Sequence, residues 1–144
     1  MKLKVLFFAL ALPFAINVQI AHAESSQAIQ QMAQILLNMD KTPNKQQQET
    51  LKNLANNAAS ANEQRLAKGL LSINGAISDE GKQEVWSVLR QISASDSERE
   101  LAKIINRFDD SASNADKERL NALLSTQTNA NQKSDKKSDK TAKK

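Results

Sequence analysis

The chain has 144 residues, of which 25% are charged and 3% aromatic, with one His and no Cys. The lack of Cys excludes disulfides, thiol nucleophiles and cysteine-based zinc sites. The formal net charge of +4 is unevenly distributed, because residues 133–144 contain six Lys and two Asp, whereas residues 24–132 contain twelve Lys and Arg against fourteen Asp and Glu.

The N-terminal residues have the pattern of a secretory signal peptide. A short basic start precedes an apolar stretch over residues 5–16, and Ala21 and Ala23 occupy the −3 and −1 positions of a cleavage site. A retained membrane helix is the alternative, but such a helix needs about 20 mostly apolar residues, and Pro13 interrupts this stretch. We therefore expect residues 1–23 to be removed, leaving a periplasmic or secreted chain that is not an integral membrane protein.

Removal of this segment also changes the chemistry that the chain can perform. The only His, His22, lies within it. The remaining chain lacks the commonest general base as well as the commonest zinc ligands.

The rest of the chain contains an internal repeat, with three segments that align without gaps over residues 33–54, 67–88 and 102–123. Their apolar residues recur at the i, i+3, i+4 and i+7 spacing of one helix face, and no alternation of period two indicates a strand. The columns that keep their character are Ala33/Ala67/Ala102, Leu36/Leu70/Ile105, Met39/Ile73/Phe108, Asp40/Asn74/Asp109, Asn44/Ser78/Ser113, Leu51/Val85/Leu120, Leu54/Val88/Leu123 and Ala55/Leu89/Leu124. The repeat predicts an all-α fold of three tandem helix–turn–helix units.

Capping residues mark where the helices begin. Ser26, Ser60 and Ser95 precede the first helix of each unit, and Glu63 and Glu98 complete capping boxes in the second and third units. The second helices begin after Asn44, Ser78 and Ser113, which are all good N-cap residues.

These signals predict six helices, near residues 27–39, 45–57, 61–74, 79–93, 96–108 and 114–125. The domain then covers residues 24–125, with units near 26–59, 60–94 and 95–125. Short loops favour antiparallel packing of consecutive helices. The units could stack as a short solenoid or close into a compact six-helix bundle.

The C-terminal residues 126–144 have no large apolar side chain and are rich in Lys. They cannot bury enough surface to offset the entropy lost on ordering, so we predict a disordered tail. Such a tail could make weak contact with an anionic envelope surface or serve only to keep the protein soluble. We expect no nucleic-acid partner for an exported protein.

The residues offer little support for catalysis or for metal and cofactor binding. The turn that begins at Asp109 has oxygen-bearing residues at alternating positions, as a calcium loop would. An EF-hand also requires Gly at position six and Glu at position twelve, and here these positions are Asn114 and Leu120. The three Gly form no phosphate-binding loop. We therefore predict no enzyme, no cofactor and no metal site.

One residue departs from the repeat pattern. Trp86 lies in a column where the other units have Lys52 and Asn121, so we expect that position to face outward. An exposed Trp is a frequent anchor for a protein partner, and Leu71, which aligns with Asn106, could extend the patch. The alternative is that a neighbouring helix covers Trp86.

These observations predict a non-enzymatic, exported helical-repeat protein that acts as an adaptor or scaffold for an unidentified protein partner. The alternative is an envelope stress or holdase-type chaperone whose basic tail contacts anionic surfaces. A holdase would protect several unrelated clients, whereas an adaptor would retain one or a few proteins.

Overall fold

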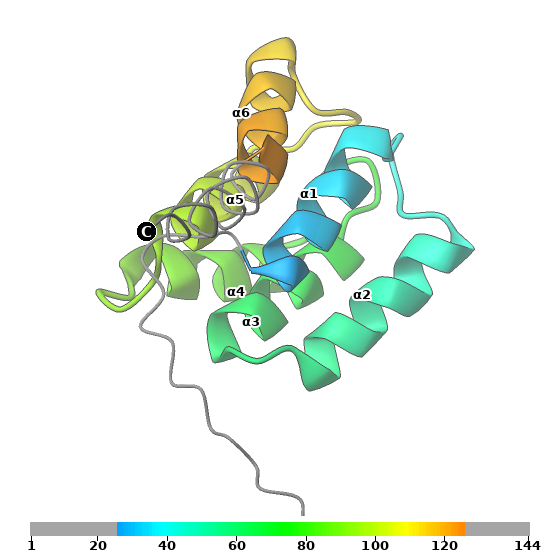
Figure 1. Cartoon of the computed structure of the whole chain (residues 1–144). Coiled ribbons are helices and arrows are strands. Elements are labelled where there is room, and N and C mark those ends of the chain that lie inside the picture. The colour runs from blue at the N-terminus through cyan, green and yellow to red at the C-terminus, as the bar shows by residue number, and fades with distance from the viewer. Residues whose placement is uncertain (1–25, 126–144) are drawn as a thin grey trace, which may run out of the picture.

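The computed structural model describes residues 26–125, which form six α-helices and no strand (Figure 1). They are α1 (Gln27–Asn38), α2 (Lys45–Asn57), α3 (Ala61–Leu71), α4 (Asp79–Arg90), α5 (Asp96–Asn106) and α6 (Asn114–Ser125). The predicted all-α class is confirmed. The expected signal peptide and Lys-rich tail lie outside the described residues.

The helices begin where the capping residues predict. The Ser60 and Ser95 side chains accept hydrogen bonds from the backbone N–H groups of Glu63 and Glu98, and both Glu side chains complete the capping boxes. An additional box, formed by Asn44 and Gln47, starts α2. Because each cap satisfies backbone donors that the helix leaves unpaired, it fixes the first residue of its helix.

Helices α3, α4 and α5 end two or three residues earlier than predicted, at Leu71, Arg90 and Asn106. Ile73 and Phe108 lie in the turns but are buried, so the apolar pattern continues beyond the ends of α3 and α5. Apolar periodicity reports burial, and a turn residue that folds back on the core continues the pattern of the helix before it.

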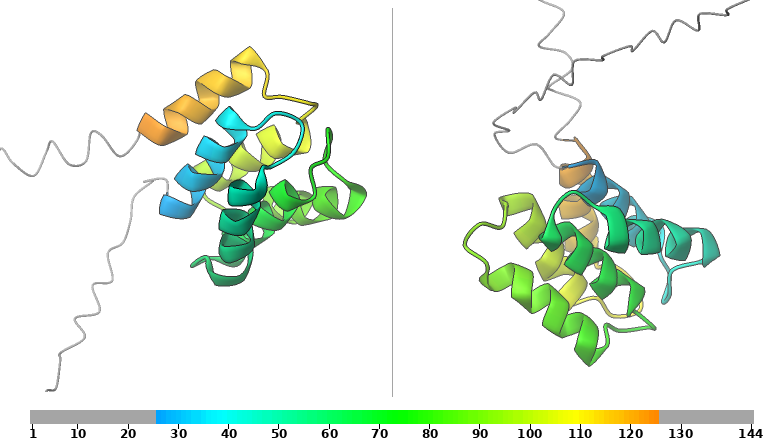
Figure 2. Two further views of the ribbon diagram at one scale, coloured as in Figure 1. Left: turned by 90° about the vertical axis from the view of Figure 1, so that its right-hand side faces the viewer. Right: turned by 90° about the horizontal axis from the view of Figure 1, so that it is seen from below.

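The odd-numbered helices α1, α3 and α5 contact one another, and each even-numbered helix packs on at least one of them. Helix α2 packs on α3, α4 packs on α5, and α6 packs on α1, where the first and last helices lie side by side (Figure 2). The aligned residues Ala33, Ala67 and Ala102 are all fully buried on the odd-numbered helices. The largest fully buried side chains are Ile29, Met32, Leu36, Leu51, Leu66, Leu70, Val85, Val88, Leu101, Ile104, Ile105 and Leu120.

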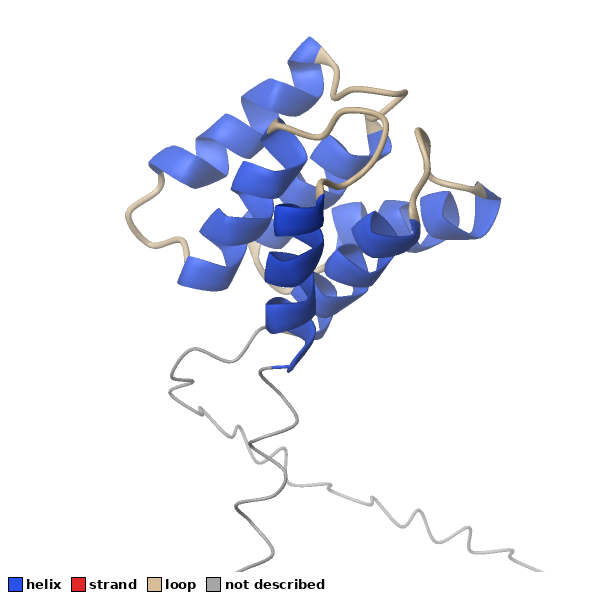
Figure 3. Ribbon diagram, turned by 90° about the horizontal axis from the view of Figure 1, so that it is seen from above, coloured by secondary structure: helices blue, strands red, loops and turns tan. Residues whose placement is uncertain are grey.

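The turns that join α1 to α2, α3 to α4 and α5 to α6 meet at one end of the molecule (Figure 3). The Lys41 N–H donates to the Asp110 carbonyl at 2.7 Å, the Asp110 N–H to the Gly75 carbonyl at 2.7 Å, and the Gly75 N–H to the Lys41 carbonyl at 2.8 Å. These three hydrogen bonds form a closed cycle. Each residue has a positive φ, at 59° for Lys41, 54° for Asp110 and 80° for Gly75.

The opposite end of the odd-numbered helices is connected through their caps. The Ser26 hydroxyl hydrogen-bonds to Glu63 Oε1, and the Ser60 hydroxyl donates to Glu98 Oε1 at 3.0 Å. Both Glu side chains are buried, and each also accepts from the backbone N–H of its own cap residue, Ser60 or Ser95. The two capping boxes therefore join the start of each hairpin to the start of the next. Since both ends of α1, α3 and α5 meet, these helices run in the same direction.

The helices of the middle hairpin pack against each other much more closely than those of the other two hairpins. Gly69 permits this close approach, because an added Cβ would lie 2.6 Å from Val85 Cγ2 of α4. The aligned positions in α1 and α5 are Ile35 and Ile104, which both have a large side chain. Among the pairs α1–α2, α3–α4 and α5–α6, close packing thus occurs only in the pair with Gly at this position.

Candidate interaction surface

Trp86 lies on the outer side of α4 with 52% of its surface exposed. Its indole Nε1–H donates a hydrogen bond of 2.8 Å to Asn106 Oδ1 on α5. The neighbouring helix therefore holds one edge of the indole but leaves half of the residue open to solvent. Trp86 is thus exposed with α5 beside one edge of its indole, and α5 does not cover it.

Basic side chains lie on the same helix face as Trp86. Lys82 and Arg90 are one turn before and one turn after it on α4, a spacing that places them beside it. Lys82 Nζ lies 3.6 Å from Asp79 Oδ1 in an exposed pair, and such pairs are weak. Arg90 is exposed and has no ion pair with another described residue. We refer to Trp86, Asn106, Lys82 and Arg90 as the Trp86 surface.

Leu71 lies at the last position of α3, partly buried and packed against the core. The hydrogen bond of Trp86 runs to α5 rather than to α3, and it reaches Asn106, the residue that aligns with Leu71 in the third unit. The contribution of Leu71 to a common patch stays a prediction. Sequence reasoning did not identify Asn106, although its polar side chain in a column with Leu37 and Leu71 was a usable signal.

Two hairpins contain a groove between their helices. The groove between α3 and α4 has a volume of about 400 Å³ and is lined by both charge signs, including Arg65, Lys68, Glu80 and Glu84. The groove between α1 and α2 has a volume of about 350 Å³, and its side chains are uncharged. They are Gln31, Gln34, Ile35, Asn38, Gln46, Gln47 and Thr50. Within residues 26–125 no group of three or more His, Cys, Asp or Glu side chains could hold a metal ion.

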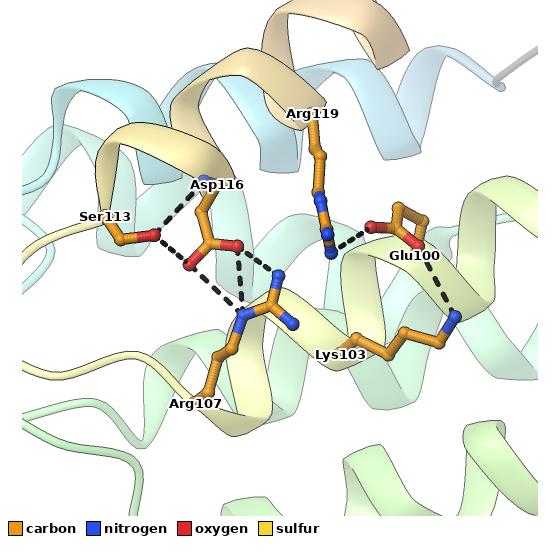
Figure 4. A network of polar contacts seen from close by, with 6 residues as sticks. All are labelled: Glu100, Lys103, Arg107, Ser113, Asp116 and Arg119. Carbon is orange, nitrogen blue, oxygen red and sulfur yellow. Dashed lines mark hydrogen bonds and ion pairs between the residues drawn. The ribbon is translucent and has the colours of Figure 1, made fainter.

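Ion pairs join α5 to α6 in the third hairpin (Figure 4). The Arg107 Nε–H donates to Asp116 Oδ1 at 2.9 Å, and the Ser113 hydroxyl donates to Asp116 Oδ2 at 2.7 Å. Arg119 Nη1 donates to Glu100 Oε1 at 3.1 Å. The pKa of Asp116 lies below its usual value, chiefly because Arg107 donates to the carboxylate and also because Ser113 does. We interpret this network as a structural link between the two helices.

None of the described helices has the length and apolar character needed to cross a membrane. Comparison with known proteins adds no assignment, because no family model, no curated protein and no solved structure matches the chain.

Proposed function

We propose that this is a non-enzymatic, exported helical protein that serves as a scaffold or adaptor and binds a protein partner through the Trp86 surface. The observation that supports this function is that Trp86 is half-exposed while its indole N–H is hydrogen-bonded to Asn106. Trp is enriched among the residues that contribute most to protein interfaces. An aromatic side chain that is already ordered loses less conformational entropy when a partner binds.

We further propose that the three hairpins form a closed arrangement and not an open solenoid. The packing of α6 on α1 supports this proposal, as does the cycle of hydrogen bonds among the three turns. In an open solenoid the first and last repeats would contact only their sequence neighbours. A closed domain keeps α4 and α5 in a fixed relation, which a preformed binding surface requires.

The proposed function is tested by photo-crosslinking in the producing cell. A photoreactive amino acid replaces Trp86 in one variant, and Lys52 or Asn121 in two control variants, because these residues occupy the same column of the repeat. We expect one or a few proteins to be captured from position 86 and not from the controls. Trp86→Ala should abolish retention of the same proteins, with the helical circular dichroism spectrum unchanged.

Capture of many unrelated unfolded chains from position 86 would instead support the holdase-type function. Equal capture from all three positions would contradict a specific Trp86 surface. Recovery of residues 24–144 from the periplasm, with Glu24 as the first residue by mass spectrometry, would test the predicted export and cleavage.

A further inference from the structure

Asn74 and Gly75 lie in the turn between α3 and α4, and the Asn74 side chain is exposed. No other Asn of the chain is followed by Gly. An Asn followed by Gly is chemically reactive, because the backbone nitrogen of Gly can attack the carboxamide of Asn, and Gly has no Cβ that would hinder the attack. Within residues 26–125 the Asn74 side chain has no hydrogen-bond partner that would hold its carboxamide away from Gly75.

The reaction of this pair is the loss of ammonia from Asn74. The Gly75 nitrogen forms a bond to Asn74 Cγ while the carboxamide C–N bond breaks, and the proton of the Gly75 amide leaves with the amino group as ammonia. Water then opens the resulting succinimide ring at either of its carbonyl carbons. Opening at one carbon gives aspartate, and opening at the other gives isoaspartate, whose backbone runs through the former side-chain atoms Cβ and Cγ. Water is the only other reactant.

Hydrogen bonds among the three turns fix the attacking nitrogen in the folded protein. The Gly75 N–H donates to the Lys41 carbonyl at 2.8 Å, so the proton that must leave is engaged. The Gly75 carbonyl accepts from the Asp110 N–H at 2.7 Å, and the Asn74 N–H donates to the Ala76 carbonyl at 3.0 Å. Attack therefore requires the turn to open, and its rate follows the fraction of molecules in which the turn is open.

The two products differ in how they fit the turn. Aspartate is the residue that the first and third turns have at this position, Asp40 and Asp109, and both of these turns take part in the cycle of hydrogen bonds. Isoaspartate lengthens the backbone before Gly75. It therefore changes the spacing on which the hydrogen bond from Gly75 to Lys41 depends.

We propose that Asn74 is a site of spontaneous deamidation, which the cycle of hydrogen bonds among the turns restrains in the folded protein. Each opening of the cycle frees the Gly75 nitrogen to attack, and the isoaspartate that forms prevents the cycle from closing again. Because the reaction is irreversible, modified protein accumulates with the age of the molecule and under conditions that open the turns.

The test is incubation of the full chain, as recovered from the producing cell, at mildly alkaline pH with and without urea, followed by trypsin digestion and mass spectrometry. Trypsin releases the segment Gly69–Lys82, in which Asn74 is the only Asn and Gln is absent. A gain in mass of this segment therefore measures conversion of Asn74 alone. We expect slow conversion in the folded protein, conversion at least about tenfold faster in urea, and two products of equal mass.

Two variants of Lys41 separate the cycle from the rest of the fold. Pro cannot adopt the φ of 59° that Lys41 has, so in Lys41→Pro the carbonyl turns away and the Gly75 N–H loses its acceptor. We expect this variant to keep its helical circular dichroism spectrum and to deamidate without urea about tenfold faster than the wild type. Lys41→Gly removes the same side chain but keeps the positive φ, and it should deamidate no faster than the wild type.

Three results would overturn the proposal: equal rates with and without urea, no conversion of Asn74 in urea, or equal rates for folded Lys41→Pro and Lys41→Gly. The comparison of the wild type with and without urea decides even if Lys41→Pro loses its helices. The Asn74→Asp variant represents the aspartate product. Aged protein that contains isoaspartate should unfold at a lower urea concentration than this variant, and equal midpoints would contradict the effect of isoaspartate on the cycle.

Discussion

The backbone N–H of Lys41 donates a hydrogen bond of 2.7 Å to the carbonyl oxygen of Asp110, and this bond joins the turn of the first hairpin to the turn of the last. Lys41 adopts a φ of 59° and Asp110 a φ of 54° to make the cycle of hydrogen bonds possible. The middle turn has Gly75 at the equivalent place, with a φ of 80°. The left-handed backbone conformation costs a residue with a Cβ roughly 1–2 kcal/mol, whereas Gly, which has no Cβ, adopts it without this strain.

We therefore expect Lys41→Gly to raise the free energy of unfolding by about 0.5–1 kcal/mol, because it relieves the strain at Lys41. Gly75→Ala should lower it by about 1 kcal/mol, and the new Cβ would also approach Asp110 Oδ1 to 3.2 Å. Urea denaturation followed by circular dichroism measures both changes. Lys45→Gly, in the first turn of α2, is the matched control and should destabilise, since Gly is a poor helix former. Destabilisation by Lys41→Gly would contradict this account.

The close approach of α3 and α4 leads to a second prediction. Gly69→Ala should lower the free energy of unfolding by about 1–3 kcal/mol, because the added Cβ overlaps Val85 Cγ2. Intrinsic helix propensity predicts the opposite sign, a gain of about 1 kcal/mol. Val85→Ala alone should also destabilise, by opening a cavity. In the double variant the overlap disappears, so the combined loss should be smaller than the sum of the two; an additive result would rule out the contact as the cause.

The Arg107–Asp116 ion pair predicts a dependence of stability on pH. Since the pKa of Asp116 is lower in the folded protein than its usual value, the pair stabilises the fold at neutral pH, and this contribution disappears as the pH falls below about 4. Asp116→Asn should lower the free energy of unfolding at pH 7 by about 1–2 kcal/mol, a modest amount because Arg107 is partly exposed. Thermal unfolding of both proteins at several pH values should show the difference shrinking toward pH 3. A constant difference across that range would exclude the linkage.

The last prediction concerns the order of the Trp86 side chain. Asn106→Leu removes the acceptor of the indole N–H and introduces the side chain that the first and second units have at this position, Leu37 and Leu71. We expect the indole to become more mobile while the fold remains intact. Because Trp86 is the only Trp of the chain, steady-state fluorescence anisotropy measures its mobility directly. Anisotropy equal to that of the wild type would show that Asn106 does not hold the indole.

Local features of the sequence predicted much of this structure. Cap residues such as Ser60 and Asn44 determined where helices begin, because their side chains bond backbone groups only a few residues away. Burial beyond the helix ends, as at Ile73, made the predicted helices too long. The capping boxes were predictable, but not that Ser60 would donate to Glu98 of the next hairpin.

Contacts between distant segments escaped the sequence-based prediction. The alignment of the three repeats was compatible with both a solenoid and a bundle, because no residue pattern in α6 identifies α1 as its packing partner. Likewise, the polar column of Trp86 predicted exposure but did not identify Asn106 as the acceptor of its N–H. Such pairs depend on how helices are placed in space, which a repeat of hydrophobic residues does not specify.

The packing of α6 on α1 also has a consequence for folding. The contact between α1 and α6 joins the two helices that are furthest apart in the sequence. Its formation closes the longest loop and costs the most conformational entropy, so we expect it to form late in folding. A ribosome makes α1 first and α6 last, and the face of α1 that α6 covers stays open until synthesis, and any transfer across a membrane, is complete. Chains truncated before Asn114 should therefore expose apolar surface and be the forms that aggregate or are degraded first.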